Sequence, residues 1–216
     1  MTKADRASPP RVVLASSSRW RAELLTRLGL PFEGLAPDFD ELGEAHRFPE
    51  LGEEGFALHL ARHKAAVVAA RRPDAWILAA DQIAVIPSER PGGSPVLLHK
   101  PGTHERAVQQ LMRLRGRVHH LVTGVVLRGP DGGSFEAIDR QEMRMRTFSE
   151  AEARTYVEAH APIDSVGAYH IEDSGIALFE YARGDDFTGI IGLPLMSVGR
   201  LFRRAGLLPG SPAALP

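Results

Sequence analysis

The chain has 216 residues and a formal net charge of -1, with 44% hydrophobic and 25% charged residues. This balance excludes the overall basic field that holds a nucleic-acid backbone. The absence of cysteine excludes disulfides, thiol nucleophiles and thiolate metal sites, and no apolar run reaches the roughly 20 residues of a membrane span. We therefore expect a cytoplasmic protein without nucleic-acid or membrane partners. Its single domain should cover residues 11–208, between a disordered tail at 1–10 and a flexible tail at 209–216.

The N-terminal part of the expected domain combines a strand, a serine turn and a helix. The β-branched run RVVLA at 11–15 predicts a buried strand, which stops at Ser16-Ser17-Ser18. Apolar residues then recur at helical spacing from Trp20 to Leu28, and Gly29 ends the helix. The first turn of a helix carries free N–H groups and a positive dipole end, so this junction predicts an anion site.

The next elements lead to an aspartate. Residues 31–41 (PFEGLAPDFDE) predict a strand that runs into an acidic loop, and residues from about 51 to 71 predict a long helix. The run WILAA at 76–80 predicts a buried strand ending at Asp81, a position where carboxylates of α/β folds face ligands. Residues 83–86 and 96–98 then suggest a hairpin around a Pro/Gly/Ser-rich turn.

The C-terminal half continues the alternation of helices and strands. Apolar patterns and turn residues predict further strands at 118–127, 136–146, 176–181 and 187–191, and helices at 104–114, 149–159 and about 193–204. Ser149 and Glu152 form a capping box for the second of these helices. The expected fold class is α/β, with a mixed β-sheet and flanking helices.

Polar residues gather at the predicted strand ends and turns. Taken singly, each has an ordinary structural interpretation as a cap, a turn residue or a solvated charge. Together, hydroxyls, cations and carboxylates are what metal-assisted cleavage of a polyphosphate requires. The candidates are Ser16, Ser18, Arg21, Asp40, Glu41, Lys64, Asp81 and Lys100.

Eight motifs along the chain resemble those of the Maf family of nucleoside triphosphate pyrophosphatases. They occur in family order: LASSSRWRAELL, APDFDE, LARHKA, AADQ, HKP, TGVVL, SVGAY and GLPL. The resemblance implies a Maf/ITPase-like fold with two lobes around a central cleft. It also implies cleavage of a nucleoside triphosphate to monophosphate and pyrophosphate, a need for magnesium or manganese, and a homodimer.

The resemblance also implies roles for individual residues. Ser16, Ser18 and Arg21 match the family's phosphate-binding loop, in agreement with the expected anion site at the helix start. Lys64 and Lys100 match two lysines that face the phosphates. Glu41 matches an acidic position that serves the metal. Asp81 matches the carboxylate treated as proton acceptor and as a second metal ligand.

Three further positions distinguish branches of the family. Trp20, Gln82 and Glu172 match the set of the branch active on 7-methyl-GTP, whereas the dTTP and UTP branch resembles Arg, Thr and Gln there. An indole face attracts a flat cation such as 7-methylguanine by roughly 0.5–2 kcal/mol, and a carboxylate accepts from both N–H groups of the guanine edge. Alternatives are a pyrophosphatase for dTTP, UTP or other modified nucleotides, and a non-catalytic nucleotide-binding regulator of cell division.

Some residues depart from the family pattern. Arg19 stands where proline is usual, and Asp173 follows Glu172 where glycine is common. His59 and His63 lie four residues apart, a spacing that can bind zinc on a helix. Because the glutamate of HExxH is absent and no third ligand is evident, we expect them to be a surface pair.

Overall fold

The sheet is mixed, with parallel strands at one side and antiparallel strands at the other. A computed structural model describes residues 11–208, and the expected tails at 1–10 and 209–216 lie outside these residues. The strand order is β2-β1-β3-β5-β6-β7, and β4 pairs with the far half of β3. Strands β2, β1 and β3 are parallel, whereas β3, β5, β6 and β7 are antiparallel. The bounds are β1 (Val12–Leu14), β2 (Phe32–Gly34), β3 (Trp76–Ile86), β4 (Val96–Leu98), β5 (Val118–Arg128), β6 (Ser134–Met145) and β7 (Phe179–Arg183).

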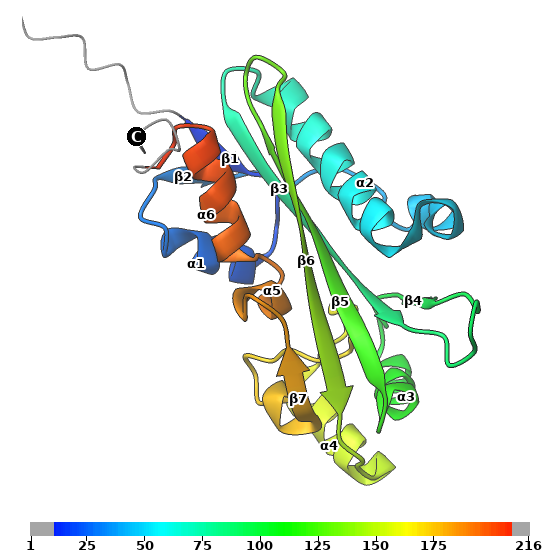
Figure 1. Cartoon of the computed structure of the whole chain (residues 1–216). Helices are drawn as coiled ribbons and strands as arrows, with labels where there is room; N and C mark the ends of the chain where they lie inside the picture. Colours follow the sequence, from blue (N-terminus) through cyan, green and yellow to red (C-terminus); the bar gives the residue numbers. More distant parts are fainter. Residues whose placement is uncertain (1–10, 209–216) are drawn as a thin grey trace, which may run out of the picture.

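Helices cover both faces of this sheet. The long helix α2 lies on one face and α1 and α6 lie on the other, while α3 and α4 pack together near the far end of the long strands (Figure 1). The bounds are α1 (Arg19–Thr26), α2 (Phe48–Arg71), α3 (His104–Leu114), α4 (Glu150–His160), α5 (Thr188–Ile191) and α6 (Leu195–Arg204), with 3-10 helices η1 (Gly43–Arg47) and η2 (Gly175–Leu178). The expected α/β class with a mixed sheet and flanking helices is therefore confirmed.

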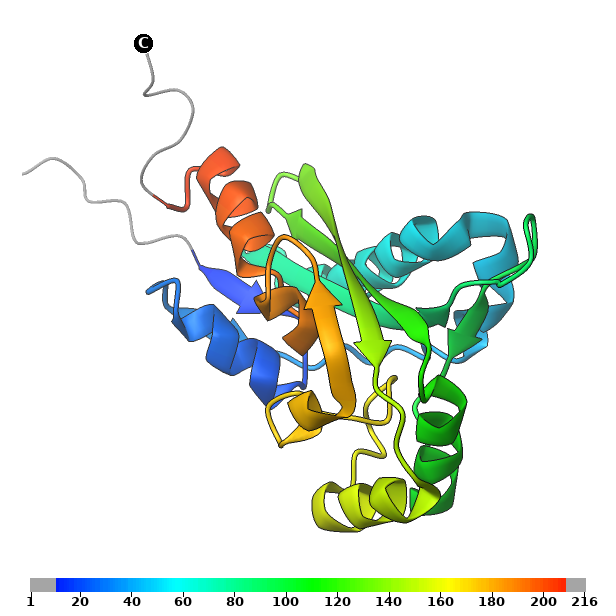
Figure 2. The ribbon, with the colours of Figure 1, turned by 60° about the horizontal axis from the view of Figure 1, so that its bottom comes forward.

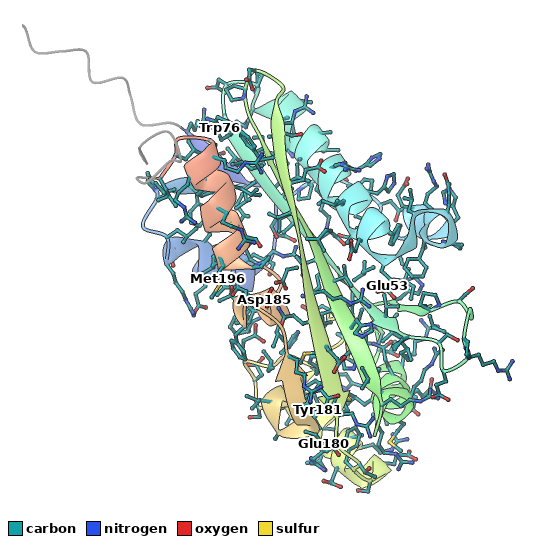
Figure 3. All side chains as sticks on the ribbon, viewed as in Figure 1. Glu53, Trp76, Glu180, Tyr181, Asp185 and Met196 are labelled. Carbon is teal, nitrogen blue, oxygen red and sulfur yellow. The ribbon has the colours of Figure 1, made fainter. Side chains whose placement is uncertain are left out.

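The apolar core is divided in the same way. Alternate residues of β3 face opposite sides, so Ile77 and Ala79 pack under α2 while Leu78 and Ala80 pack under α1 and α6. A separate cluster joins α3, α4 and the far ends of the long strands. One lobe contains α3, α4 and the far ends of the long strands, and the other contains α1, α6 and the parallel strands. Figure 2 shows α3 and α4 set apart from α1 and α6. Trp76 marks one end of the sheet, and Glu180 and Tyr181 on β7 mark the other (Figure 3).

Near the C-terminus, the predicted strand at 187–191 is wrong, and the predicted strand at 176–181 is correct only from residue 179 onward. Residues 188–191 form a short helix because Asp186 Oδ1 accepts hydrogen bonds from the backbone N–H and the hydroxyl of Thr188, which starts a helical turn. Residues 175–178 form a 3-10 helix, and the strand β7 begins only at Phe179. Strand β7 pairs with β6 rather than with the segment after it.

The position of Asp81 also differs from the prediction. It lies in the middle of one continuous strand, β3, and not at the end of a shorter strand. The residues of β3 before and after Asp81 pair with β5 in an unbroken register, and Asp81 itself pairs with Gly124. The remaining elements agree with the sequence within a few residues, and the capping box of α4 is present.

No helix within residues 11–208 is long and apolar enough to cross a membrane.

Candidate active site

A cavity of about 580 Å³ opens beside the middle of β3. Strand β1 pairs with β3 only as far as Leu78, and β4 pairs with it only from Ala84 onward. The interval between these two pairings contains Asp81 and Gln82. The cavity therefore forms where one neighbouring strand has ended and the next has not yet begun. The segments that leave β1 and β4 at this interval supply further side chains to it.

The segment after β1 forms one wall of the cavity. Ser18 is the N-cap of α1 and accepts a hydrogen bond from the backbone N–H of Arg21, while Ser16 Oγ accepts from the N–H of Ser18 at 3.1 Å. The Arg21 guanidinium is held in place because its Nε donates to the carbonyl of Gly192 at 2.9 Å. The structure thus gives the three predicted phosphate-loop residues a common position at a helix N-terminus.

Four charged side chains form a chain on the α2 side of β3. The buried ammonium of Lys64 lies between two carboxylates: it contacts Asp81 Oδ1 and lies 2.6 Å from Glu41 Oε1. Lys100, just after β4, lies 3.7 Å from Glu41 Oε2. The four residues expected to serve catalysis and metal binding, which are far apart in sequence, therefore meet at one end of the cavity.

The pKa values of the two carboxyl groups are shifted in opposite directions. Burial raises the pKa of Asp81, with a further contribution from the Glu41 charge, and this effect exceeds the stabilising charges of Lys64 and Arg21. For Glu41 burial also acts to raise the pKa, but the attraction of Lys64 and Lys100 exceeds it, so the pKa is lowered. Glu41 therefore stays charged to lower pH than Asp81 does, and Asp81 is the group better suited to take up a proton.

The three residues expected to contact the base, Trp20, Gln82 and Glu172, line the same cavity and are called the base pocket. Gln82 points to the opposite face of β3 from Asp81, and its Nε2 donates to Thr123 Oγ1 at 3.1 Å and to the Gly189 carbonyl at 2.7 Å. Both amide protons are thereby used, so Gln82 has its carbonyl oxygen left to accept from a ligand. Glu172 is half-buried, and burial raises its pKa. The guanidinium carbon of Arg19 lies 4.3 Å from the centroid of the Trp20 ring.

Several residues at the cavity were not predicted from the sequence. Thr123 and Gly189 fix the orientation of Gln82, and His170 lines the cavity with its Nε2 at 3.1 Å from Asp164 Oδ1. These contacts join segments about 40 to 107 residues apart or lie in a loop without periodic pattern, so no local signal points to them. Asp40, the neighbour of Glu41, instead accepts from the N–H of Leu42 as a turn residue.

The structure adds a neighbour to the pair His59 and His63. A third potential ligand is present, because Glu44 on η1 reaches the same side of α2 and its Oε2 lies 2.6 Å from His59 Nε2. The sequence does not reveal this contact, since Glu44 is 15 residues from His59.

Comparison with known proteins identifies the family. The model of the Maf family, described as Maf-like protein, matches residues 11–205. The chain belongs to the Maf family.

Named Maf relatives cover almost the whole chain. A 7-methyl-GTP pyrophosphatase of Xanthomonas campestris is 39% identical over 91% of this chain and 97% of its own length. A 7-methyl-GTP pyrophosphatase of Bordetella pertussis is 40% identical over 96% of this chain and 99% of its own length. Among solved structures, the Ham1 protein of Staphylococcus aureus is 16% identical, with 76% of this chain and 89% of that one covered and a TM-score of 0.42.

The donors at the cavity fit the divalent metal that the Maf resemblance implies. Carboxylate oxygens are the protein ligands that Mg²⁺ and Mn²⁺ prefer, and both Glu41 and Asp81 line the cavity. Glu41 Oε1 and Asp81 Oδ1 both contact the Lys64 ammonium, so the space between the two carboxylates accommodates a positive charge. Glu41, whose side chain is 37% exposed and whose pKa is lowered, is the more accessible of the two carboxylates.

Proposed function

We propose that this Maf-family protein is a nucleotide pyrophosphatase that hydrolyses the bond between the α- and β-phosphates of a nucleoside triphosphate, with a preference for 7-methyl-GTP. The observation that carries this proposal is the arrangement at the middle of β3. There Asp81 faces the charged group of Lys64 and Glu41, while the next residue, Gln82, faces the opposite side of the strand within the same cavity. A nucleotide that lies across β3 at this point has its phosphates on the Asp81 side and its base on the Gln82 side.

The cations of the cavity account for binding of the triphosphate. The N–H groups at the start of α1 and the side chains of Ser16, Ser18 and Arg21 bind phosphate oxygens from one wall. Lys100, whose side chain is 54% exposed, is free to turn from Glu41 toward the phosphates. Neutralisation of the phosphate charge and fixed orientation are the main means by which proteins accelerate phosphoryl transfer.

The hydrolytic step uses Asp81 as proton acceptor. A water molecule attacks the α-phosphorus and loses a proton to Asp81, the bond from that phosphorus to the bridging oxygen breaks, and pyrophosphate leaves. The raised pKa of Asp81 makes it a stronger base than an ordinary aspartate once it is ionised. Lys64, in contact with Asp81 and Glu41, orients both carboxylates.

Glu41 and Asp81 are the residues that would hold a magnesium or manganese ion. Such an ion supplies charge neutralisation and a lower pKa of the attacking water.

Residues on the opposite side of β3 bind the base of the nucleotide. The Trp20 indole offers a stacking face, the Gln82 carbonyl accepts a hydrogen bond, and Glu172 accepts from the N1–H and N2–H groups of a guanine. The positive charge of 7-methylguanine strengthens the contacts with Trp20 and Glu172. Because Arg19 already stacks on Trp20, a cationic base either uses the other indole face or displaces this guanidinium.

The reaction is tested with Asp81→Asn. Pyrophosphate release from 7-methyl-GTP with Mg²⁺ or Mn²⁺ should fall about 10²- to 10⁴-fold, because the proton acceptor is lost while the shape is kept. Asp139→Asn is the matched control, since Asp139 is also a buried carboxyl with a raised pKa but lies on β6 in a different cavity. Full activity in Asp81→Asn would contradict the assigned role. Nucleotide binding without any turnover in the unaltered protein would favour a regulator instead.

The base preference is tested by exchange of the trio. Trp20→Arg, Gln82→Thr and Glu172→Gln together should shift the ratio of kcat/KM for 7-methyl-GTP over dTTP or UTP by about tenfold or more toward the pyrimidines, since each lost contact contributes on the order of 1 kcal/mol. A screen of pyrophosphate release over standard and modified nucleotides gives the ratio. Equal or better turnover of dTTP or UTP by the unaltered protein would reject the preference and keep the reaction.

A further inference from the structure

Three metal-ligating side chains meet outside the nucleotide cavity. His59 and His63 lie one helical turn apart on α2, and Glu44 reaches them from the 3-10 helix η1. One ligand atom from each residue lies within 4.8 Å of the others. None of the three lines the nucleotide cavity, so this cluster is a separate feature of the molecule.

The two imidazole rings are held in place by aromatic neighbours. His63 stacks on Phe39, with ring centroids 5.2 Å apart and planes inclined by 19°. His59 lies against Phe56 at 6.4 Å and 20°, and the two imidazole centroids are 4.4 Å apart. Packing of this kind limits the rotamers of both ligands, which lowers the entropy lost on binding a metal.

An ordinary ion pair explains only part of this arrangement. The 2.6 Å contact from Glu44 Oε2 to His59 Nε2 is a satisfactory hydrogen bond by itself. It involves only one of the two imidazoles. Ligand atoms of a tetrahedral zinc site, at roughly 2.0–2.2 Å from the metal, lie about 3.3–3.6 Å apart. Contraction from at most 4.8 Å to this spacing therefore shortens the distance between any two ligand atoms by about 1.5 Å or less.

We propose that Glu44, His59 and His63 bind a divalent transition-metal ion, with zinc as the best match to two imidazoles and a carboxylate. Water fills the fourth position. Imidazole ligands distinguish this site from the oxygen-only pair Glu41 and Asp81, which suits magnesium or manganese. The two sites are joined through the chain, because η1 begins two residues after Glu41 and His63 directly precedes Lys64. A bound ion would fasten the segment that carries Glu41 to the helix that carries Lys64.

Zinc titration of the metal-free protein tests this site. Isothermal titration calorimetry should show one zinc per chain with a Kd of about 10 µM or tighter, as expected for three protein ligands. His59→Ala, His63→Ala and Glu44→Gln should each weaken binding at least about tenfold. His104→Ala is the matched control, because His104 is an exposed histidine at the start of another helix, α3. Zinc affinity that is unchanged in His63→Ala, or absent in the unaltered protein up to about 100 µM, would overturn the proposal.

Two further measurements separate this site from the nucleotide cavity. Cobalt substitution should give the intense visible absorption of a four-coordinate ion in the unaltered protein and lose it in His63→Ala. Zinc at about 100 times its Kd should raise the Tm by about 5–10 °C in the unaltered protein and not in His63→Ala. His63→Ala without zinc should keep its pyrophosphatase activity with magnesium. Zinc binding in a protein without nucleotide turnover would leave this proposal standing and reject only the proposed function.

Discussion

At the scale of single residues, the proposed hydrolysis depends on pKa shifts of opposite direction in two carboxyl groups. Asp81 is 3% exposed, and its burial raises its pKa, while Lys64 and Lys100 lower the pKa of the more open Glu41. The same lysine contacts both groups, so the difference arises from burial and from the second lysine rather than from Lys64 alone. In the proposed reaction, this difference keeps Glu41 charged for cation binding and leaves Asp81 as the group that accepts a proton.

The pH dependence of turnover follows from these shifts. Asp81 must be ionised to accept a proton, so activity should be lost as the pH falls through its raised pKa, with an acid limb above the usual range of aspartate. Lys64→Gln removes the charge that lowers the pKa of Asp81. This variant should move the acid limb to higher pH and reduce kcat, as measured from pyrophosphate release at each pH. An acid limb that moves to lower pH in this variant would contradict the assignment to Asp81.

The proposed base preference also depends on Thr123, which orients Gln82. Thr123 is fully buried and accepts one of the two hydrogen bonds that orient Gln82. Thr123→Val keeps the shape and removes this bond, so the Gln82 amide loses part of its fixed orientation. The preference for 7-methyl-GTP over UTP should fall about fivefold to tenfold, for a hydrogen bond of about 1 kcal/mol. The effect should appear mainly in KM, which separates a positioning role from general damage.

Thr155→Val provides the control for this experiment. Thr155 also donates a side-chain hydrogen bond, to the carbonyl of Ala151, but it is exposed on α4. An unchanged substrate ratio in Thr123→Val, or an equal change in Thr155→Val, would contradict the positioning role.

At the scale of elements, the close approach of α2 to the sheet brings Lys64 to Asp81. Gly124 on β5 pairs with Asp81 on β3, and cross-strand partners share a face of the sheet. A Cβ atom at Gly124 would lie 2.5 Å from the backbone carbon of Ala57 on α2. Because backbone cannot turn away as a side chain can, glycine at this position permits the helix to lie over the aspartate.

Gly124→Ala should therefore destabilise the protein by about 1–3 kcal/mol and push α2 outward. Urea unfolding measures the free energy, and the loss of pyrophosphatase activity reports the displaced Lys64. Gly34→Ala is the matched control, because a Cβ at Gly34 on β2 would meet no atom within 4 Å. Its free energy of unfolding should stay within about 0.5 kcal/mol of the unaltered protein. Equal stability of the two variants would contradict the close-packing argument.

Prediction from sequence worked best for elements whose signals are local. The capping box at Ser149 and Glu152, the serine turn before α1 and the long strands β5 and β6 were predicted correctly. The segment 187–191 was predicted wrongly because its apolar run favours a strand by pattern. Its helical turn depends on Asp186, whose second carboxylate oxygen also accepts from the N–H of Met196 in α6.

At the scale of the whole molecule, the cavity is a consequence of strand register. β1 ends its pairing with β3 at Leu78 and β4 begins at Ala84, which leaves the Asp81–Gln82 interval beside an open space. Because successive residues of a strand face opposite sides, this interval places a charged group on one side and an amide on the other. The expected homodimer stays a prediction.

The sequence by itself determined the motif set, the α/β class and the ten residues expected to act on a nucleotide, all of which line one cavity. These features follow from residue types and short-range patterns, which are complete within a few positions of the chain. Only the tertiary structure decided that Asp81 lies inside a continuous strand, that Thr123 orients Gln82, and that Glu44 joins His59 and His63. Each of these depends on contacts between segments 15 or more residues apart, or on pairing between strands. Packing of the complete chain sets such contacts, and no single stretch of sequence contains them.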